Sequence, residues 1–293
     1  MPRWSAIVKT TALEMLSEPL SLLVLIAALS IEVLAPAFHY HQFGEATRMA
    51  RDAGFSALFT CGTVLAVFST IRAFRREVES GTLEMALAHP VSRTGFFLAK
   101  TLGAFAAYAA FAAIVFATSL VMVAGAAVGG RIAAENGDVA RIYGPCFAAG
   151  IAAIVLPLVV GAALDRFARC RFVPTAFLLA FVVSAASAAW FADLPLLARL
   201  APVSVLLALA AMVPLAASAA FSFRFKANGA AAACGVVVAA MLPAMGGYFL
   251  SDALSSGGSV PWSYVGLAAL ATAPAVLFFL VLGTGFIKGR DAA

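Results

Sequence analysis

Charged side chains are scarce in this sequence, and their scarcity excludes an ordinary soluble domain. Asp, Glu, Lys and Arg together make up 11% of the 293 residues, whereas soluble domains carry about 25%. No polar stretch is long enough to build a hydrophobic core of its own. Because 63% of the residues are hydrophobic and the mean hydropathy is +1.02, the composition predicts one transmembrane domain over residues 1–293.

Motifs for catalysis and nucleotide binding are also lacking. The sequence has no G-x-x-x-x-G-K-[ST] phosphate loop, and its nearest run, Gly283–Lys288, has the wrong spacing and does not follow a strand. Neither G-x-S-x-G nor H-E-x-x-H occurs. We therefore expect that the chain is not an enzyme and binds no cofactor itself.

Metal and nucleic-acid sites are not indicated either. The four cysteines occur singly, which is typical of small core or interface residues rather than of a disulfide or zinc framework. His39 and His41 could contact a metal, but no third ligand lies near them. The net charge of +5 comes from basic residues in short loops beside apolar runs, so we attribute it to membrane orientation and not to nucleic acid.

Long apolar runs recur along the whole chain. A helix of about 20 residues crosses the roughly 30 Å hydrocarbon core. The sequence therefore predicts an all-α polytopic membrane protein with about eight transmembrane helices. Prolines 202, 214 and 243 leave an alternative of six spans plus a re-entrant hairpin formed by the sixth and seventh segments. The eight segments are residues 19–38, 54–71, 98–128, 147–164, 173–192, 203–223, 230–250 and 263–287.

Basic residues predict the orientation of these spans. With residue 1 in the cytoplasm and eight alternating spans, 14 of the 19 Lys and Arg residues face the cytoplasm and 5 face the other side. Such residues are enriched in cytoplasmic loops. We therefore expect a multi-pass protein of the inner (plasma) membrane with both termini in the cytoplasm.

Two features near the N-terminus suggest how the first span sits in the bilayer. Residues 1–18 predict an amphipathic interfacial helix, with Trp4 and Leu13 among its apolar residues; a plain leader to the first span is the alternative. Glu32 is the one acidic residue well inside an apolar segment. Its carboxylate can reach the membrane interface or face the inside of the bundle, and we favour the interface.

The connection over residues 72–97 is the most polar part of the chain. The second span is expected to continue past the membrane as a helix until Gly81 breaks it. Thr82 can cap a short helix with one apolar face, and Pro90 ends that helix. Ser92 or Thr94 can cap the third span. The result is a short amphipathic helix across the end of two spans, either contacting a partner or lying passively on the lipid.

This run resembles the ABC-2 type of ABC-transporter permease. It contains an E-x-G-T-L-E sequence (Glu79–Glu84), a P-V-S-R turn (Pro90–Arg93) and a downstream lysine, Lys100, between the second and third spans. The resemblance implies that Thr82–His89 is a coupling helix that docks into a cytoplasmic ATP-binding subunit, which carries ATP and Mg. It also implies that two permease subunits, identical or different, pair around a central path. Members of the family usually have six spans.

The sequence therefore predicts the membrane permease subunit of an ATP-driven transporter, most simply an exporter. The residues that the resemblance assigns to docking of the ATP-binding subunit are Glu77, Glu79, Gly81, Thr82, Leu83, Glu84, Leu87, His89, Pro90 and Arg93.

Two other classes of protein stay open. An ion-coupled secondary transporter or channel usually carries polar groups at the bilayer midplane, and Glu32 is the one candidate here. A membrane scaffold would share the docking connection but would need no path for a substrate. Neither class is excluded by the residues.

Overall fold

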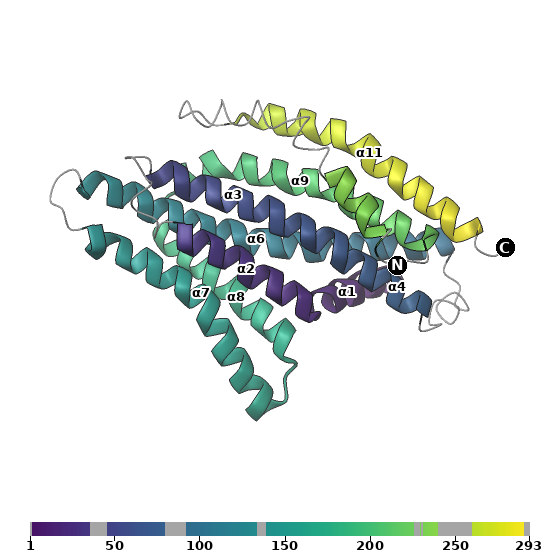
Figure 1. Ribbon diagram of the computed structural model, residues 1–293, viewed down its shortest axis with the longest axis horizontal. Helices are drawn as coiled ribbons and strands as arrows, with labels where there is room; N and C mark the ends of the chain where they lie inside the picture. Colours follow the sequence, from purple (N-terminus) through teal and green to yellow (C-terminus); the bar gives the residue numbers. More distant parts are fainter. Residues whose placement is uncertain are drawn as a thin grey trace.

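The protein is all helical over the residues described by its structure, a computed structural model (Figure 1). These residues are 2–35, 46–79, 92–133, 139–225, 229, 231–239 and 260–289. The predicted fold class is thus confirmed. The elements are α1 (Pro2–Leu16), α2 (Pro19–Leu34), α3 (Ala46–Val64), the π-helix η3 (Leu65–Ser69), α4 (Thr70–Glu79), α6 (Arg93–Ala133), α7 (Val139–Ala168), α8 (Phe172–Phe191), α9 (Leu194–Arg224) and α11 (Trp262–Gly289).

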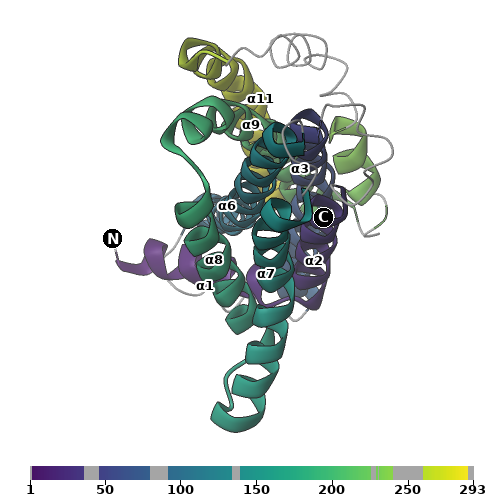
Figure 2. The same ribbon diagram turned by 90° about the vertical axis from the view of Figure 1, so that its left-hand side faces the viewer.

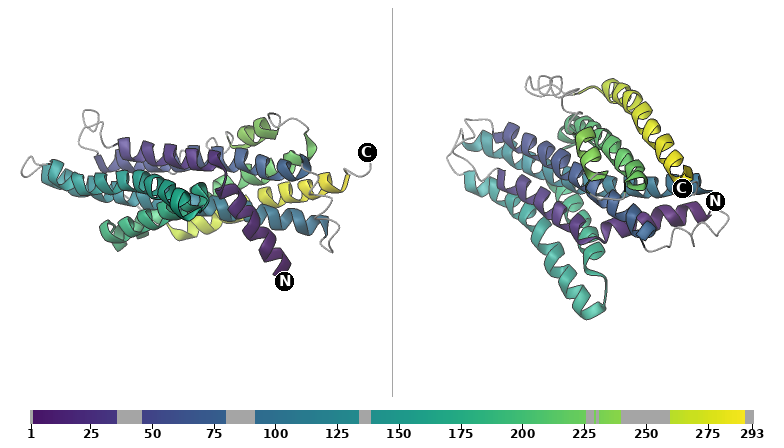
Figure 3. Two further views of the ribbon diagram at one scale, coloured as in Figure 1. Left: turned by 90° about the horizontal axis from the view of Figure 1, so that it is seen from below. Right: turned by 45° about the vertical axis from the view of Figure 1, so that its right-hand side comes forward.

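Six helical stretches within the described residues are long and apolar enough to cross a membrane. They are the helix formed by α3, η3 and α4, together with α6, α7, α8, α9 and α11. The first predicted span, α2, has 16 residues. It passes the same test only together with α1, from which it is bent by 63° (Figure 3). The described residues thus contain six candidate spans, or seven with this pair, and most of the seventh predicted segment lies outside them.

The seventh predicted segment, residues 230–250, lies only partly within the described residues. Its neighbours in the chain, α9 and α11, run parallel. Val265 of α11 shares a core cluster with Val203 near the start of α9. Ile287 shares another with Ala219 near the end of α9. Helices α9 and α11 therefore cross the bundle in the same direction, and the predicted crossing between them stays a prediction.

Helix α6 lies at the centre of the bundle (Figure 2). It contacts α1, α2, α3, α7, α8, α9 and α11. Of the residues in the most apolar part of α6, 72% are buried, whereas only 6% of those in the most apolar part of α11 are buried. Alanine is frequent along α6, which lets neighbouring backbones approach closely in lipid. The outer helices, by contrast, present leucine, valine and phenylalanine outward.

Helices α7 and α8 form a hairpin whose turn projects away from the other helices (Figure 2). Arg169, at the end of α7, has φ 53° and thus adopts the left-handed conformation common after a helix C-terminus. Phe167 beside it is 87% exposed. The other described helices do not contact this turn of the hairpin, so its side chains are exposed.

Helix α1 packs against α6. Thr11 and Met15 are its buried residues, whereas Trp4 and Leu13 of the predicted apolar side are 42% and 48% exposed. Whether that side faces the membrane interface stays a prediction. Gly103 of α6 permits the packing of α1 on α6, because a Cβ at that position would lie 2.7 Å from the Val8 carbonyl oxygen.

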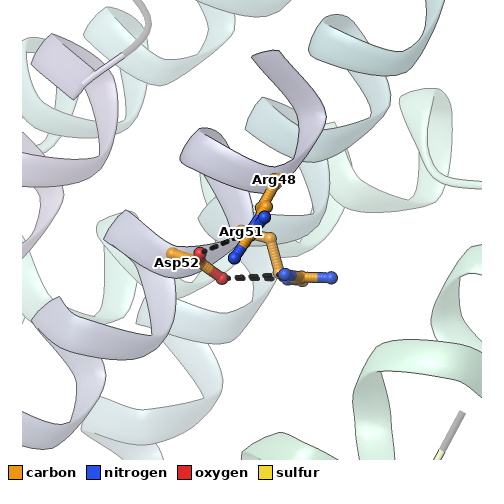
Figure 4. Close-up of polar contacts among 3 residues, drawn as sticks. All are labelled: Arg48, Arg51 and Asp52. Carbon is orange, nitrogen blue, oxygen red and sulfur yellow. Dashed lines mark hydrogen bonds and ion pairs between the residues drawn. The ribbon is translucent and has the colours of Figure 1, made fainter. Parts of the chain in front are cut away.

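The first part of α3 carries charged residues. Arg48 and Arg51 lie beside Asp52, with Arg48 Nε 3.8 Å and an Arg51 nitrogen 3.0 Å from its carboxylate (Figure 4). Because Asp52 is about half exposed, these pairs contribute at most about 1 kcal/mol each to stability.

We expect Gly103→Ala to lower the stability of the protein by about 1–3 kcal/mol, because the added methyl group would push α1 away from α6. Thermal unfolding in detergent measures the loss. Gly285→Ala is the matched control, because a Cβ at Gly285 meets no atom within 4 Å. Equal melting temperatures for the two variants would show that the close approach of α1 contributes nothing.

Candidate functional site

The site under consideration lies at the end of the bundle where α4 finishes at Glu79 and α6 begins at Arg93, which we call the loop end. Glu77 and Glu79 are in the last turn of α4, and Arg93 is the first residue of α6. The continuation of the second span as a helix up to the predicted connection is thus confirmed.

The other predicted docking residues lie outside the described residues. The assignment of a coupling helix and of its contacts with an ATP-binding subunit therefore stays a prediction. The residues concerned are Gly81, Thr82, Leu83, Glu84, Leu87, His89 and Pro90. His39 and His41 also lie outside, and the residues described contain no group of three side chains able to hold a metal.

The first turn of α6 is capped and packed closely against α1. The Ser92 hydroxyl oxygen accepts a hydrogen bond of 3.1 Å from the Gly95 N–H, as an N-cap serine does. A Cβ on Gly95 would lie 2.8 Å from the Trp4 ring. The chain therefore enters α6 in a fixed direction, with the indole of α1 against its backbone. Of the two predicted caps, Ser92 is the one that bonds to the helix.

Charged groups connect α4 with the corner between α1 and α2. A nitrogen of Arg76 lies 3.7 Å from the Glu14 carboxylate. Burial raises the pKa of the nearby Glu18 carboxyl. The positive charge of Arg72 opposes this rise, the negative charge of Glu14 adds to it, and the positive charge of Arg76 opposes it. Because Arg76 is 70% exposed, the ion pair itself adds little stability.

Three phenylalanine rings join three helices at the loop end. Phe74 of α4, Phe97 of α6 and Phe223 of α9 lie with ring centroids 5.6–5.9 Å apart in edge-to-face arrangements. Such pairs each contribute about 0.5–1.5 kcal/mol beyond the area that they bury. Gly283 of α11 makes its closest approach to the Phe97 ring. We call Phe74, Phe97 and Phe223 the aromatic trio.

Lys100 lies directly beside the aromatic trio and is fully buried. Its Nζ donates a hydrogen bond of 2.7 Å to the Ala73 carbonyl oxygen of α4. The same nitrogen is 5.2 Å from the centroid of the Phe74 ring and 6.0 Å from that of Phe96. The sequence places this lysine near the cytoplasmic end of the third predicted span and does not indicate its burial.

A π-helical turn interrupts the helix that leads to the loop end. Over Leu65–Ser69 the backbone of the second span is π-helical, a form that often occurs at functional sites. The Ser69 hydroxyl is 3.2 Å from the Ser21 hydroxyl, which donates to the Met15 carbonyl at 2.7 Å. The turn is thereby linked to the corner between α1 and α2. No sequence signal marks it, because its residues are ordinary span residues.

Glu32 is buried inside the bundle, and the predicted interfacial position is wrong. The side chain is 1% exposed, and its Oε1 accepts a hydrogen bond of 2.7 Å from the Ser119 hydroxyl of α6. Gly54 of α3 makes the room, because a Cβ there would collide with the Ser119 hydroxyl. A carboxyl group buried in a span commonly has a function, so Glu32 joins the residues to be tested.

Comparison with known proteins identifies the family. A family model for an "ABC-2 family transporter protein" matches residues 5–187, which is more than half of the chain. The matched part begins in α1, ends within α8 and includes α4 and the first turns of α6. Comparisons with curated proteins and with solved structures found no match.

We expect Ser119→Ala to destabilise the protein by about 1–3 kcal/mol, because it removes the hydrogen bond to the buried Glu32 carboxyl. Combined with Glu32→Leu, the loss should be smaller than the sum of the two single losses, as for residues in contact. Thermal unfolding measures both. Thr284→Ala, which removes a hydroxyl bonded within its own helix, is the control. Additive losses would exclude the proposed contact between the two side chains.

Proposed function

Because the chain belongs to the ABC-2 family of transporter proteins, we propose that it is the permease subunit of an ATP-driven exporter. Family membership and six candidate spans make it a membrane transport component. The outward direction, the separate ATP-binding subunit and the pairing with a second permease subunit are parts of the proposal. ATP and Mg would be held by the partner subunit, which supplies the free energy of hydrolysis.

The observation that carries the proposal is the length of the two helices on either side of residues 80–91. Helix α6 has 41 residues, which corresponds to about 60 Å at 1.5 Å per residue, twice the thickness of the hydrocarbon core. On the other side the chain is helical without a break from Ala46 to Glu79. These lengths support a connection that lies in water, where a soluble subunit can reach it.

The packing at the loop end supports the same conclusion. A docking segment transmits motion only if its two ends are fixed to the spans. Ser92 fixes the beginning of α6, and the aromatic trio holds α4, α6 and α9 together. We propose that closure of two ATP-binding subunits displaces residues 80–91 and that the spans then change access across the membrane. Glu77 and Glu79 would place negative charge beside the docked subunit.

Glu32 favours a second candidate function. A carboxyl group buried between α2, α3 and α6 is the kind of group on which ion-coupled transport depends. An ion-coupled carrier needs no ATP-binding subunit, whereas the proposed permease does. A scaffold would bind such a subunit but would not move a substrate.

The proposal predicts that an ATPase co-purifies with the tagged protein from native membranes. Leu83→Asp and Gly81→Pro should each reduce the recovered ATPase at least tenfold, because they place a charge on the apolar docking face or disrupt the start of its helix. Mass spectrometry of the eluate measures this loss. Leu194→Asp is the matched control, since Leu194 is 82% exposed at the start of α9, where an acidic residue suits the helix dipole.

The size-exclusion profile of each variant establishes that it is folded. Full recovery of the ATPase with folded Leu83→Asp and Gly81→Pro would overturn docking through residues 80–91. Absence of any ATPase from the folded unsubstituted protein would favour the ion-coupled carrier, for which Glu32→Gln should then abolish transport.

A further inference from the structure

The ammonium group of Lys100 is buried in a bundle whose interior is mostly apolar. Among the residues that the structure describes, Lys100 and Glu32 are the charged side chains with less than 2% exposure. Burial of a charge costs several kcal/mol. A methionine would fill the same space without that cost, because replacing a buried charge by an apolar side chain is often neutral or stabilising. Stability alone therefore does not account for a lysine at this position.

The contacts of Lys100 reach from α6 to α4. The hydrogen bond to the Ala73 carbonyl oxygen, at 2.7 Å, crosses between the two helices. The Phe74 ring of α4 and the Phe96 ring of α6 lie at 5.2 and 6.0 Å from the ammonium nitrogen, within the range of cation–π attraction. Charge-assisted hydrogen bonds are about twice as strong as neutral ones. The lysine thus holds one backbone position of α4 to α6.

The position of this contact relates both helices to residues 80–91. Ala73 lies six residues before the end of α4 at Glu79, and Lys100 lies seven residues after the start of α6 at Arg93. At 1.5 Å per residue, each is about 10 Å from its end of the connection. The contact is therefore the same distance along both helices. A displacement of the connection reaches α4 and α6 at the level where they are joined.

We propose that Lys100 is a positioning residue that joins the last turns of α4 to the first turns of α6, so that the two helices move as one body. The proposal rests on the proposed function, because it assigns to Lys100 the transfer of motion from the docking segment to both spans. The aromatic trio extends this body to α9 through Phe74 and Phe223. Lys100 itself contacts no substrate in this proposal.

The first experiment uses the isolated permease. Spin labels are attached at Arg72→Cys on α4 and Leu102→Cys on α6, two exposed positions, after replacement of the four native cysteines. EPR gives the distance distribution between the labels. We expect a narrow distribution for the unsubstituted lysine and for Lys100→Arg. Lys100→Met should broaden it at least twofold, and Lys9→Met, at an exposed lysine of α1, should leave it narrow.

If Lys100→Met does not fold, Lys100→Gln, which keeps a neutral hydrogen-bond donor, is measured in its place. It should also broaden the distance distribution, because the charge is lost. A distribution that stays narrow in whichever folded neutral variant is measured would overturn the proposal.

The second experiment uses the complex with the co-purified ATPase. Addition of ATP and vanadate should leave the distance between the labels unchanged with Lys100 or Lys100→Arg, because both helices move together. In the neutral variant the same addition should shift the distance, and ATP hydrolysis should continue. If Lys100 only stabilises the protein, the neutral variant should lose complex formation and ATP hydrolysis to the same extent. That result would refute the proposal. Failure to recover any ATPase would count against the proposed function, while the first experiment still decides whether Lys100 joins the two helices.

Discussion

Close packing of neighbouring helices against α6 is the constraint on which the rest of the bundle depends. In the hydrocarbon core each span must be helical to satisfy its own backbone, so side chains decide only how near the helices approach. Gly103 lets the Val8 carbonyl of α1 come close, and Gly125 does the same for Cys146 of α7. Because α6 contacts at least seven other helices, the distance of each from α6 also determines where helices that do not contact one another lie.

Buried polar groups then fix the register that small residues leave free. Apolar surfaces in lipid can slide along each other at little cost, since hydrocarbon tails replace lost contacts. In the second half of α6, the hydroxyl of Ser119 donates a hydrogen bond to Glu32 of α2. In its first turns, Lys100 donates a hydrogen bond to the Ala73 carbonyl oxygen of α4. Each contact becomes unfavourable if the helices shift by a turn, because a buried polar group would lose its partner.

The sequence was sufficient for the all-helical fold, the extension of the second span as a helix and the cap at Ser92. Those features follow from hydropathy and local helix chemistry. The position of Glu32 and the buried face of α1 could not be derived in this way. Hydropathy shows that a residue lies within an apolar run, but not whether it points to lipid or to another helix. Glu32 is buried because Ser119 and Gly54, far away in sequence, meet it.

The candidate site shows the same division more sharply. The acidic run and the P-V-S-R turn pointed to the connection between α4 and α6 through their resemblance to a family. The aromatic trio, however, needs Phe223 of α9, which lies beyond the part of the chain matched by the family model. A motif within one connection cannot reveal a partner contributed by a later helix. The surroundings of Lys100 therefore became apparent only when the helices were placed together.

The π-helical turn η3 separates two sets of these contacts. After η3 in the chain, α4 contacts α6 through Lys100 and α9 through the aromatic trio. Before η3, α3 packs on α6, where Ala50 and Val123 share a core cluster. Helix η3 lies between these two sets of contacts, and π-helical turns often occur at functional sites. The Ser69 hydroxyl, 3.2 Å from that of Ser21, links this turn to the corner between α1 and α2.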